Sequence, residues 1–188
     1  MSRYRRTHRG LPLPNITSIV IAVAVMFLLV WRGTTLSNES AVPEPTGTDY
    51  GSLYDVVRVV DGDTLVADVE GEEIKIRLIG VNTPESVHED DSKNVPEGKD
   101  ASAYMDNLLK GRKIYLVYDE DREDDYGRTL AYVYTEDFEF VNLLLVEEGL
   151  AECMRIEPNV RFASDFAKAE SAARAADKGF WTNGAFAE

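Results

Sequence analysis

The sequence predicts a mainly β domain with added helices (α+β), folded as a small closed barrel and preceded by a separate apolar segment. Three observations support this prediction. Residues 53–78 contain short runs of alternating apolar and polar side chains, rich in valine and isoleucine, as half-buried strands are. Helical periodicity is confined to stretches after residue 96 that end at glycines. The first 32 residues follow neither pattern and contain no acidic side chain.

The strand predictions follow the alternation in chain order. Glu70–Glu72 has the composition of a hairpin turn between two of the strands. Arg77 alternates with Ile76 and Leu78, so it lies on the opposite face of its strand. Five strands with helices inserted and appended predict a five-stranded Greek-key barrel of the OB type. The predicted strands are 53–60, 64–69, 74–78, 113–117 and 129–134.

Three helices are predicted, at 97–110, 140–148 and 164–177, each ended by a glycine. The polar stretch 86–96 lacks periodicity and is predicted to be a loop beside the candidate site. Two interpretations of it are open, a mobile lid over the site and a solvated acidic connection. The acidic stretch 118–126 connects two of the strands.

The N-terminal segment has the composition of a membrane anchor. Residues 10–31 are uncharged, and as a helix the apolar part would span roughly 24 Å of a hydrocarbon core of about 30 Å. Because the arginines precede it, we expect an uncleaved signal anchor with the domain outside the cell. Cleavage around 37–41, with secretion, is the alternative. The predicted organisation is a basic cytoplasmic tail (1–15), a transmembrane or signal-anchor segment (16–32), a flexible linker (33–52), the folded domain (53–182) and a tail (183–188).

The soluble part is strongly acidic. After residue 32 the chain has 34 acidic and 15 basic side chains. This balance opposes non-specific binding of polyanions at low salt. It is typical of proteins from salt-loving sources, where at about 1 M salt the Debye length is only about 3 Å; a merely acidic extracellular protein is the alternative. Cys153 is the single cysteine, so no internal disulfide can form.

Two neighbouring motifs carry the candidate chemistry. In the first, Gly62 separates Asp61 from Asp63, so that both carboxylates can face one point. The second brings Arg77 and, just past it, Glu85. An arginine beside a cation and a carboxylate is suited to phosphodiester hydrolysis. Turn capping is the simpler interpretation of an Asp-Gly pair by itself.

Five motifs occur in order between residues 54 and 181: VVDGDT, IRLIGVNTPE, YGRTLAYVY, VNLLLVEEGLA and AESAARAADKGFW. Together they resemble the staphylococcal-nuclease (thermonuclease) family. The resemblance implies an OB-fold enzyme that uses Ca²⁺ to hydrolyse DNA and RNA, with departure of the 5′-oxygen and 3′-phosphate products. We expect it to act as a monomer.

The resemblance also implies a calcium site. Its ligands would be the carboxylate of Asp63, the side chain of Asn82 and the backbone carbonyl of Thr83, with Asp61 acting through water or from behind these ligands. Asn82 departs from the family pattern, which has aspartate there. An amide keeps an oxygen ligand but lacks the negative charge, so we expect weaker calcium binding.

The catalytic residues implied by the resemblance are Arg77 and Arg128, which would bind the phosphate, and Glu85, which would act as the general base or orient the water. Tyr126 would lie near the substrate phosphate. The aromatic residues that follow the Gly-Leu-Ala motif in the staphylococcal enzyme are absent here, and Phe162 and Arg155 are candidates to replace them against a base.

The rival hypothesis is a non-catalytic OB-fold module, anchored at the membrane, that binds nucleic acid or protein. Such a module needs neither both arginines nor the glutamate. The presence of Asp63, Arg77, Glu85 and Arg128 in one chain therefore favours the enzyme.

Overall fold

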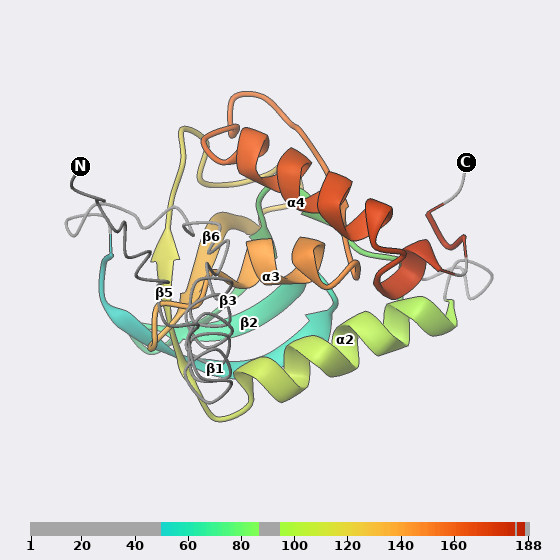
Figure 1. The fold of residues 1–188 in the computed structure, drawn as a ribbon. Helices are drawn as coiled ribbons and strands as arrows, with labels where there is room; N and C mark the ends of the chain where they lie inside the picture. The colour runs from blue at the N-terminus through green and yellow to red at the C-terminus, as the bar shows by residue number, and fades with distance from the viewer. Residues whose placement is uncertain (1–49, 87–94, 183, 187–188) are drawn as a thin grey trace, which may run out of the picture. The chain divides into compact units, whose positions relative to one another are not determined.

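The computed structural model describes residues 50–86, 95–182 and 184–186, which belong to one unit of the chain, residues 42–188. Five strands form a closed barrel in the order β1-β2-β3-β6-β5 (Figure 1). The predicted five-stranded OB-type barrel is thereby confirmed. The barrel strands are β1 (Leu53–Asp61), β2 (Thr64–Val69), β3 (Glu72–Leu78), β5 (Lys113–Val117) and β6 (Thr129–Thr135).

The barrel closes through a pairing between strands that are distant in sequence. β3 and β6 run parallel, with Arg77 opposite Leu130 and Leu78 opposite Ala131. The other barrel pairs are antiparallel. Because β6 begins at Thr129, the parallel register brings Arg128 close to the end of β3 that carries Arg77.

A small second sheet was not predicted. It pairs β4 (Val81–Asn82) with β7 (Glu152–Cys153), so Asn82 lies opposite Glu152 rather than in a free turn. This sheet holds the stretch after Arg77 against the stretch before Met154. Two-residue strands have too few positions for an alternating pattern, so the sequence contains no signal for them.

The three predicted helices are present with slightly shifted ends. They are α2 (Pro96–Leu109), α3 (Val141–Glu147) and α4 (Ala163–Ala175), followed by the short 3₁₀ helix η2 (Gly179–Trp181). α2 packs against β1, whereas α3 packs against β6 and α4 (Figure 1). The buried face of α2 comprises Gly98, Ala101, Met105 and Leu109.

Aromatic side chains fill the core between the barrel and the last two helices. The Phe140 ring stacks on Tyr134 with centroids 4.4 Å apart, and Phe162 meets Tyr132 edge-on at 4.6 Å. Phe162 is only 5% exposed. The suggestion that Phe162 stacks against a substrate base is therefore wrong, because its ring is committed to the core.

The folded domain begins slightly earlier than residue 53. Tyr50 lies within the predicted linker, yet its ring packs 5.0–5.4 Å from the rings of Tyr115, Tyr134 and Phe138. These contacts attach the chain to the barrel before β1 starts.

Several predictions concern residues outside the described ones: the basic tail, the segment 16–32, the linker up to residue 49 and most of the 86–96 loop. Among the described residues, no helix has both the length and the hydrophobicity needed to cross a membrane.

Candidate active site

The turn between β1 and β2 buries two carboxylates. Asp61 is 8% and Asp63 is 7% exposed. Gly62 makes this possible, because a Cβ at that position would lie 2.6 Å from the Thr83 hydroxyl oxygen and 2.7 Å from the Ala101 Cβ. The glycine therefore lets the turn pack directly against α2 and against the residue that follows Asn82.

Asp63 forms a nearly buried ion pair with Arg77. Arg77 Nη2 lies 3.0 Å from Asp63 Oδ2, and the two side chains are 13% and 9% exposed. Thr83 N donates to the same carboxylate oxygen at 3.1 Å, and the Thr64 hydroxyl donates to Asp63 Oδ1 at 3.0 Å. Both oxygens of Asp63 therefore have hydrogen-bond donors, which compensates the cost of burying the charge.

The Arg77 guanidinium is fixed by backbone oxygens as well. Nη1 donates to Leu78 O at 3.0 Å and to Val81 O at 2.9 Å. Burial, with a contribution from the charge of Arg128, lowers the pKa of Arg77 from its ordinary value, although Asp63, Glu85 and Asp61 act in the opposite direction. The group remains a cation at neutral pH. Five of the predicted site residues are thus close enough to interact electrostatically.

Two of the predicted calcium ligands, Asp63 and Asn82, have side-chain oxygens that face the same Arg77 nitrogen. Asn82 Oδ1 accepts from Arg77 Nη2 at 3.5 Å, so it shares that nitrogen with Asp63 Oδ2. Thr83 is next to Asn82 and in contact with Asp63. A donor set made only of carboxylate, amide and carbonyl oxygens suits a hard cation. Among the described residues, no group of three or more His, Cys, Asp or Glu side chains could hold a metal ion.

Asp61 is occupied by a structural network. Its Oδ1 accepts from Gly62 N at 2.8 Å, from the Ser86 hydroxyl at 2.6 Å and from the Ser102 hydroxyl at 3.2 Å. These bonds tie the first turn to the residue after Glu85 and to α2. The contacts of Asp61 Oδ1 therefore agree with the interpretation of Asp61 as a residue that caps the turn.

Glu85 is exposed, but its backbone is held closely. Val95 N donates to Glu85 O at 3.0 Å. A Cβ at Gly98 would lie 2.3 Å from the same carbonyl oxygen, so only glycine lets α2 approach so closely. Asp61, Ser86 and Gly98 together fix the position from which the Glu85 carboxylate extends.

Arg128 belongs to a more exposed part of the site. Its Nε donates to Asp124 Oδ2 at 2.6 Å, and its backbone N donates to Asp124 Oδ1 at 2.9 Å. The Tyr126 ring is 85% exposed, and its centroid lies 5.5 Å from Arg128 Cζ. Since Asp124 occupies Nε, the two terminal nitrogens of the fork remain suited to bidentate contact with a phosphate.

Both arginines line one pocket of ≈ 340 Å³, hereafter the site pocket. Tyr126 and Met154 also line it, and Arg77 Nη2 lies 4.0 Å from the Met154 sulfur. The exposed side chains of Met154 and Ile156 form one wall of the pocket. This wall is aliphatic, whereas Phe162 or Arg155 was proposed from the sequence as the contact for a base. The pocket therefore combines two cations and the carboxylates of Asp124 and Asp125 with an apolar wall.

Comparison with known proteins decides the family. The profile described as "Staphylococcal nuclease homologue" matches residues 75–183. A thermonuclease of Staphylococcus hyicus is 36% identical over 169 residues, which cover 89% of this chain and 97% of that protein. The chain belongs to the staphylococcal nuclease homologue family. A thermonuclease of Staphylococcus intermedius is 35% identical (87% and 94% covered), and endonuclease YncB of Bacillus subtilis (strain 168) is 35% identical (69% and 61% covered).

Several supporting residues of this staphylococcal nuclease homologue were missed by sequence reasoning. They are Ser86, Gly98 and Ser102 around Glu85, and Asp124 beside Arg128. The i to i+4 spacing of Asp124 and Arg128 was a usable local signal. The other three act across 13 residues or more of sequence, through contacts that no local pattern indicates.

Proposed function

We propose that the chain is a nuclease that hydrolyses phosphodiester bonds in DNA and RNA with the help of Ca²⁺. The observation that carries the proposal is the convergence of two arginines on the site pocket, next to a carboxylate pair and an exposed glutamate. A phosphodiester is the substrate class that two guanidinium groups so placed can bind.

The arginines would bind the scissile phosphate and stabilise the charge that develops on it. The guanidinium of Arg77 is held by Asp63 and by two backbone carbonyls. It therefore needs to move little during the reaction. Arg128 would present its terminal nitrogens to the same pocket, beside Tyr126. Glu85 would accept a proton from the attacking water or orient it. Departure of the 5′-oxygen would leave a 3′-phosphate.

Asp63, Asn82 and the Thr83 carbonyl would hold the calcium ion. When bound, Ca²⁺ polarises a phosphoryl oxygen and partly neutralises its charge. Asp61 contributes by fixing the turn that carries Asp63. With asparagine at position 82, the protein presents one negative charge fewer than a pair of aspartates would.

For location, we propose that residues 16–32 anchor the protein with the folded unit outside the cell, and that this unit acts as a monomer. The basic residues before that segment support the orientation. A fusion of residues 1–45 to a reporter should stay in the membrane with the reporter outside. Recovery of a soluble mature form that begins near residue 40 would show secretion after cleavage instead.

The function is tested by incubating the full chain with plasmid DNA and with RNA across salt concentrations, with calcium or with a chelator. We expect cleavage of both with calcium and none with the chelator. Binding of either nucleic acid without cleavage under all conditions would contradict the proposal.

A further inference from the structure

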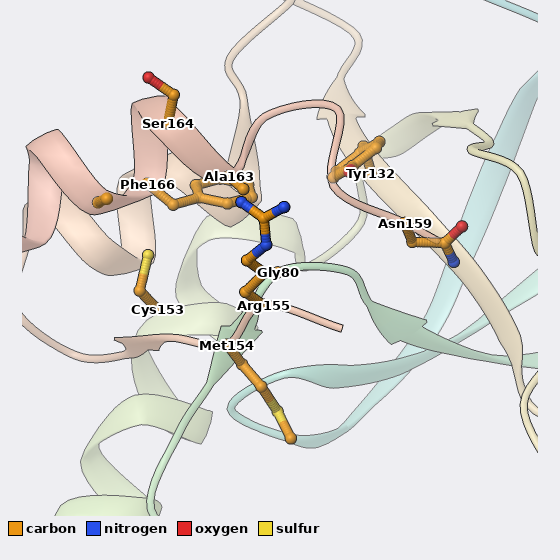
Figure 2. Close-up of a pocket in the computed structure, with 10 residues that line it drawn as sticks. Gly80, Tyr132, Cys153, Met154, Arg155, Asn159, Ala163, Ser164 and Phe166 are labelled. Atoms are coloured by element: carbon orange, nitrogen blue, oxygen red, sulfur yellow. The ribbon is translucent and has the colours of Figure 1, made fainter. Parts of the chain in front are cut away.

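A second cavity, of ≈ 300 Å³, lies on the α4 side of the residues that follow β7 (Figure 2). We name it the Arg155 pocket. Carbon and sulfur atoms form most of its lining. Burial, with a smaller effect of Glu170, raises the pKa of Cys153 to about 11, so its thiol is neutral and forms part of the apolar wall. The lining residues used below are Cys153, Met154, Arg155, Ser164, Phe166 and Ala167.

The Arg155 pocket adjoins the site pocket. Gly80, Met154 and Asn159 line both cavities. After β7, Met154 borders both cavities, whereas Arg155 lines only the second one and Ile156 lines only the site pocket. Figure 2 shows Met154 pointing away from Arg155. The two cavities therefore share Gly80, Met154 and Asn159 as a common boundary.

A cation that an anion can reach lies at this pocket. Arg155 Nη2 is 2.7 Å from Glu157 Oε1, and both side chains are 66% exposed. Exposed pairs of this kind contribute little energy, so a phosphate can displace Glu157 at small cost. The planar guanidinium can then hold the phosphate with two parallel hydrogen bonds.

We propose that the Arg155 pocket binds a nucleobase of the substrate strand, adjacent to the nucleotide in the site pocket, with Arg155 on the neighbouring phosphate. This inference rests on the proposed nuclease function. An apolar cavity with an exposed arginine, bordering the pocket that holds Arg77 and Arg128, fits a base and its phosphate together. A base can enter such a cavity only when it is unpaired.

The experiment compares two substrates and four variants of the full chain in calcium. One substrate is a single-stranded hexanucleotide; the other is a nitrophenyl phosphodiester of one nucleotide, which has no second base. Ala167→Trp fills the pocket from an exposed position of α4, and Ala172→Trp places the same ring on α4 away from both pockets. Arg155→Ala removes the cation, and Arg58→Ala is its control, from an exposed pair with Glu73.

The readout is kcat/KM for the hexanucleotide divided by kcat/KM for the nitrophenyl ester. We expect Ala167→Trp and Arg155→Ala each to lower this ratio about tenfold, the scale of one lost base or phosphate contact. The two controls should stay within about twofold of wild type.

The outcomes separate the two proposals. If the wild type cleaves both substrates but Ala167→Trp matches Ala172→Trp, the pocket does not take a base and the nuclease assignment stands. An equal loss on both substrates also overturns the inference, because it points to a structural effect or to a different occupant. If the wild type cleaves neither substrate, the nuclease proposal itself fails.

Discussion

The two arginines of the site differ in burial and in the number of groups that hold them. Arg77 is 13% exposed and is held by Asp63 and by the carbonyls of Leu78 and Val81. Arg128 is 29% exposed and is held by one carboxylate, Asp124, in a turn whose neighbour Tyr126 is almost fully exposed. One arginine is built into the barrel, whereas the other is attached to its rim.

Because of this difference, the two arginines should contribute unequally to the stability of the fold although both contribute to catalysis. The Arg77 region must satisfy buried charges whether or not substrate is bound, so its geometry is fixed in advance. The Asp124 turn can adjust to the strand that it meets. Substitutions of the two arginines should therefore resemble one another in activity and differ in stability.

The largest expected effect is on turnover. Arg77→Ala and Arg128→Ala should each lower kcat by at least about 100-fold, because each removes a charge aimed at the reacting phosphate. Steady-state cleavage of an oligonucleotide measures this, with Arg58→Ala as the matched control. Near-wild-type turnover in either variant would remove that arginine from the mechanism.

Unfolding should distinguish the same two variants. Arg77→Ala leaves Asp63 buried beside two carbonyls that lose their donors, at a cost of about 2–4 kcal/mol. Arg128→Ala breaks a partly exposed pair and should cost about 1 kcal/mol or less. Denaturant unfolding monitored by tryptophan fluorescence gives both values. Equal destabilisation would refute the contrast drawn between the two regions.

The next effect concerns calcium. Asn82→Asp adds a ligand charge and should tighten binding by about tenfold, since ligand charge tunes calcium affinity over decades. Titration calorimetry measures this, with Asn107→Asp on the exposed face of α2 as the charge control. Activity at sub-saturating calcium should rise if occupancy limits the enzyme. Unchanged affinity, while Asp63→Ala abolishes binding, would show that residue 82 points away from the metal.

The smallest effect is a pH dependence at the rim. Burial raises the pKa of Asp124, but hydrogen bonds from the Arg128 backbone and side chain and from Tyr126 N outweigh it, so the pKa lies below its ordinary value of 3.8. A carboxyl group whose pKa is lowered in the folded state stabilises the fold at pH values above its ordinary pKa. This stabilisation is lost as the pH falls through the pKa of the folded state. Wild type should therefore lose up to about 1 kcal/mol relative to Asp124→Asn below pH 4. Parallel stability curves for the two proteins would show that Asp124 does not titrate this way.

The sequence predicts the barrel well because its strands alternate and its helices end at glycines. It does not predict the parallel pairing of β3 with β6, which joins residues more than 50 positions apart, nor the two-residue strands around Asn82. Tyr50 was assigned to the linker because a lone aromatic among polar residues shows no periodicity, yet three ring contacts hold it.

Within the site, motifs indicated the charged residues but not what holds them. The Asp61–Gly62–Asp63 turn, Arg77 and Arg128 were recognisable from residue type and spacing. The roles of Gly98 and Ser102 depend on how closely α2 approaches Glu85 and Asp61, which tertiary packing alone decides. Phe162 was misassigned because a buried aromatic and an exposed stacking aromatic are indistinguishable in sequence.

The most direct test of the central claim is the cleavage rate of Glu85→Gln in single turnover at saturating calcium, with enzyme in excess over a labelled oligonucleotide. Glu72→Gln, at an exposed position at the start of β3, is the matched control. We predict wild-type rates for the control and a rate at least about 100-fold lower for Glu85→Gln, with oligonucleotide binding retained. Cleavage by Glu85→Gln at the wild-type rate would contradict the site described here.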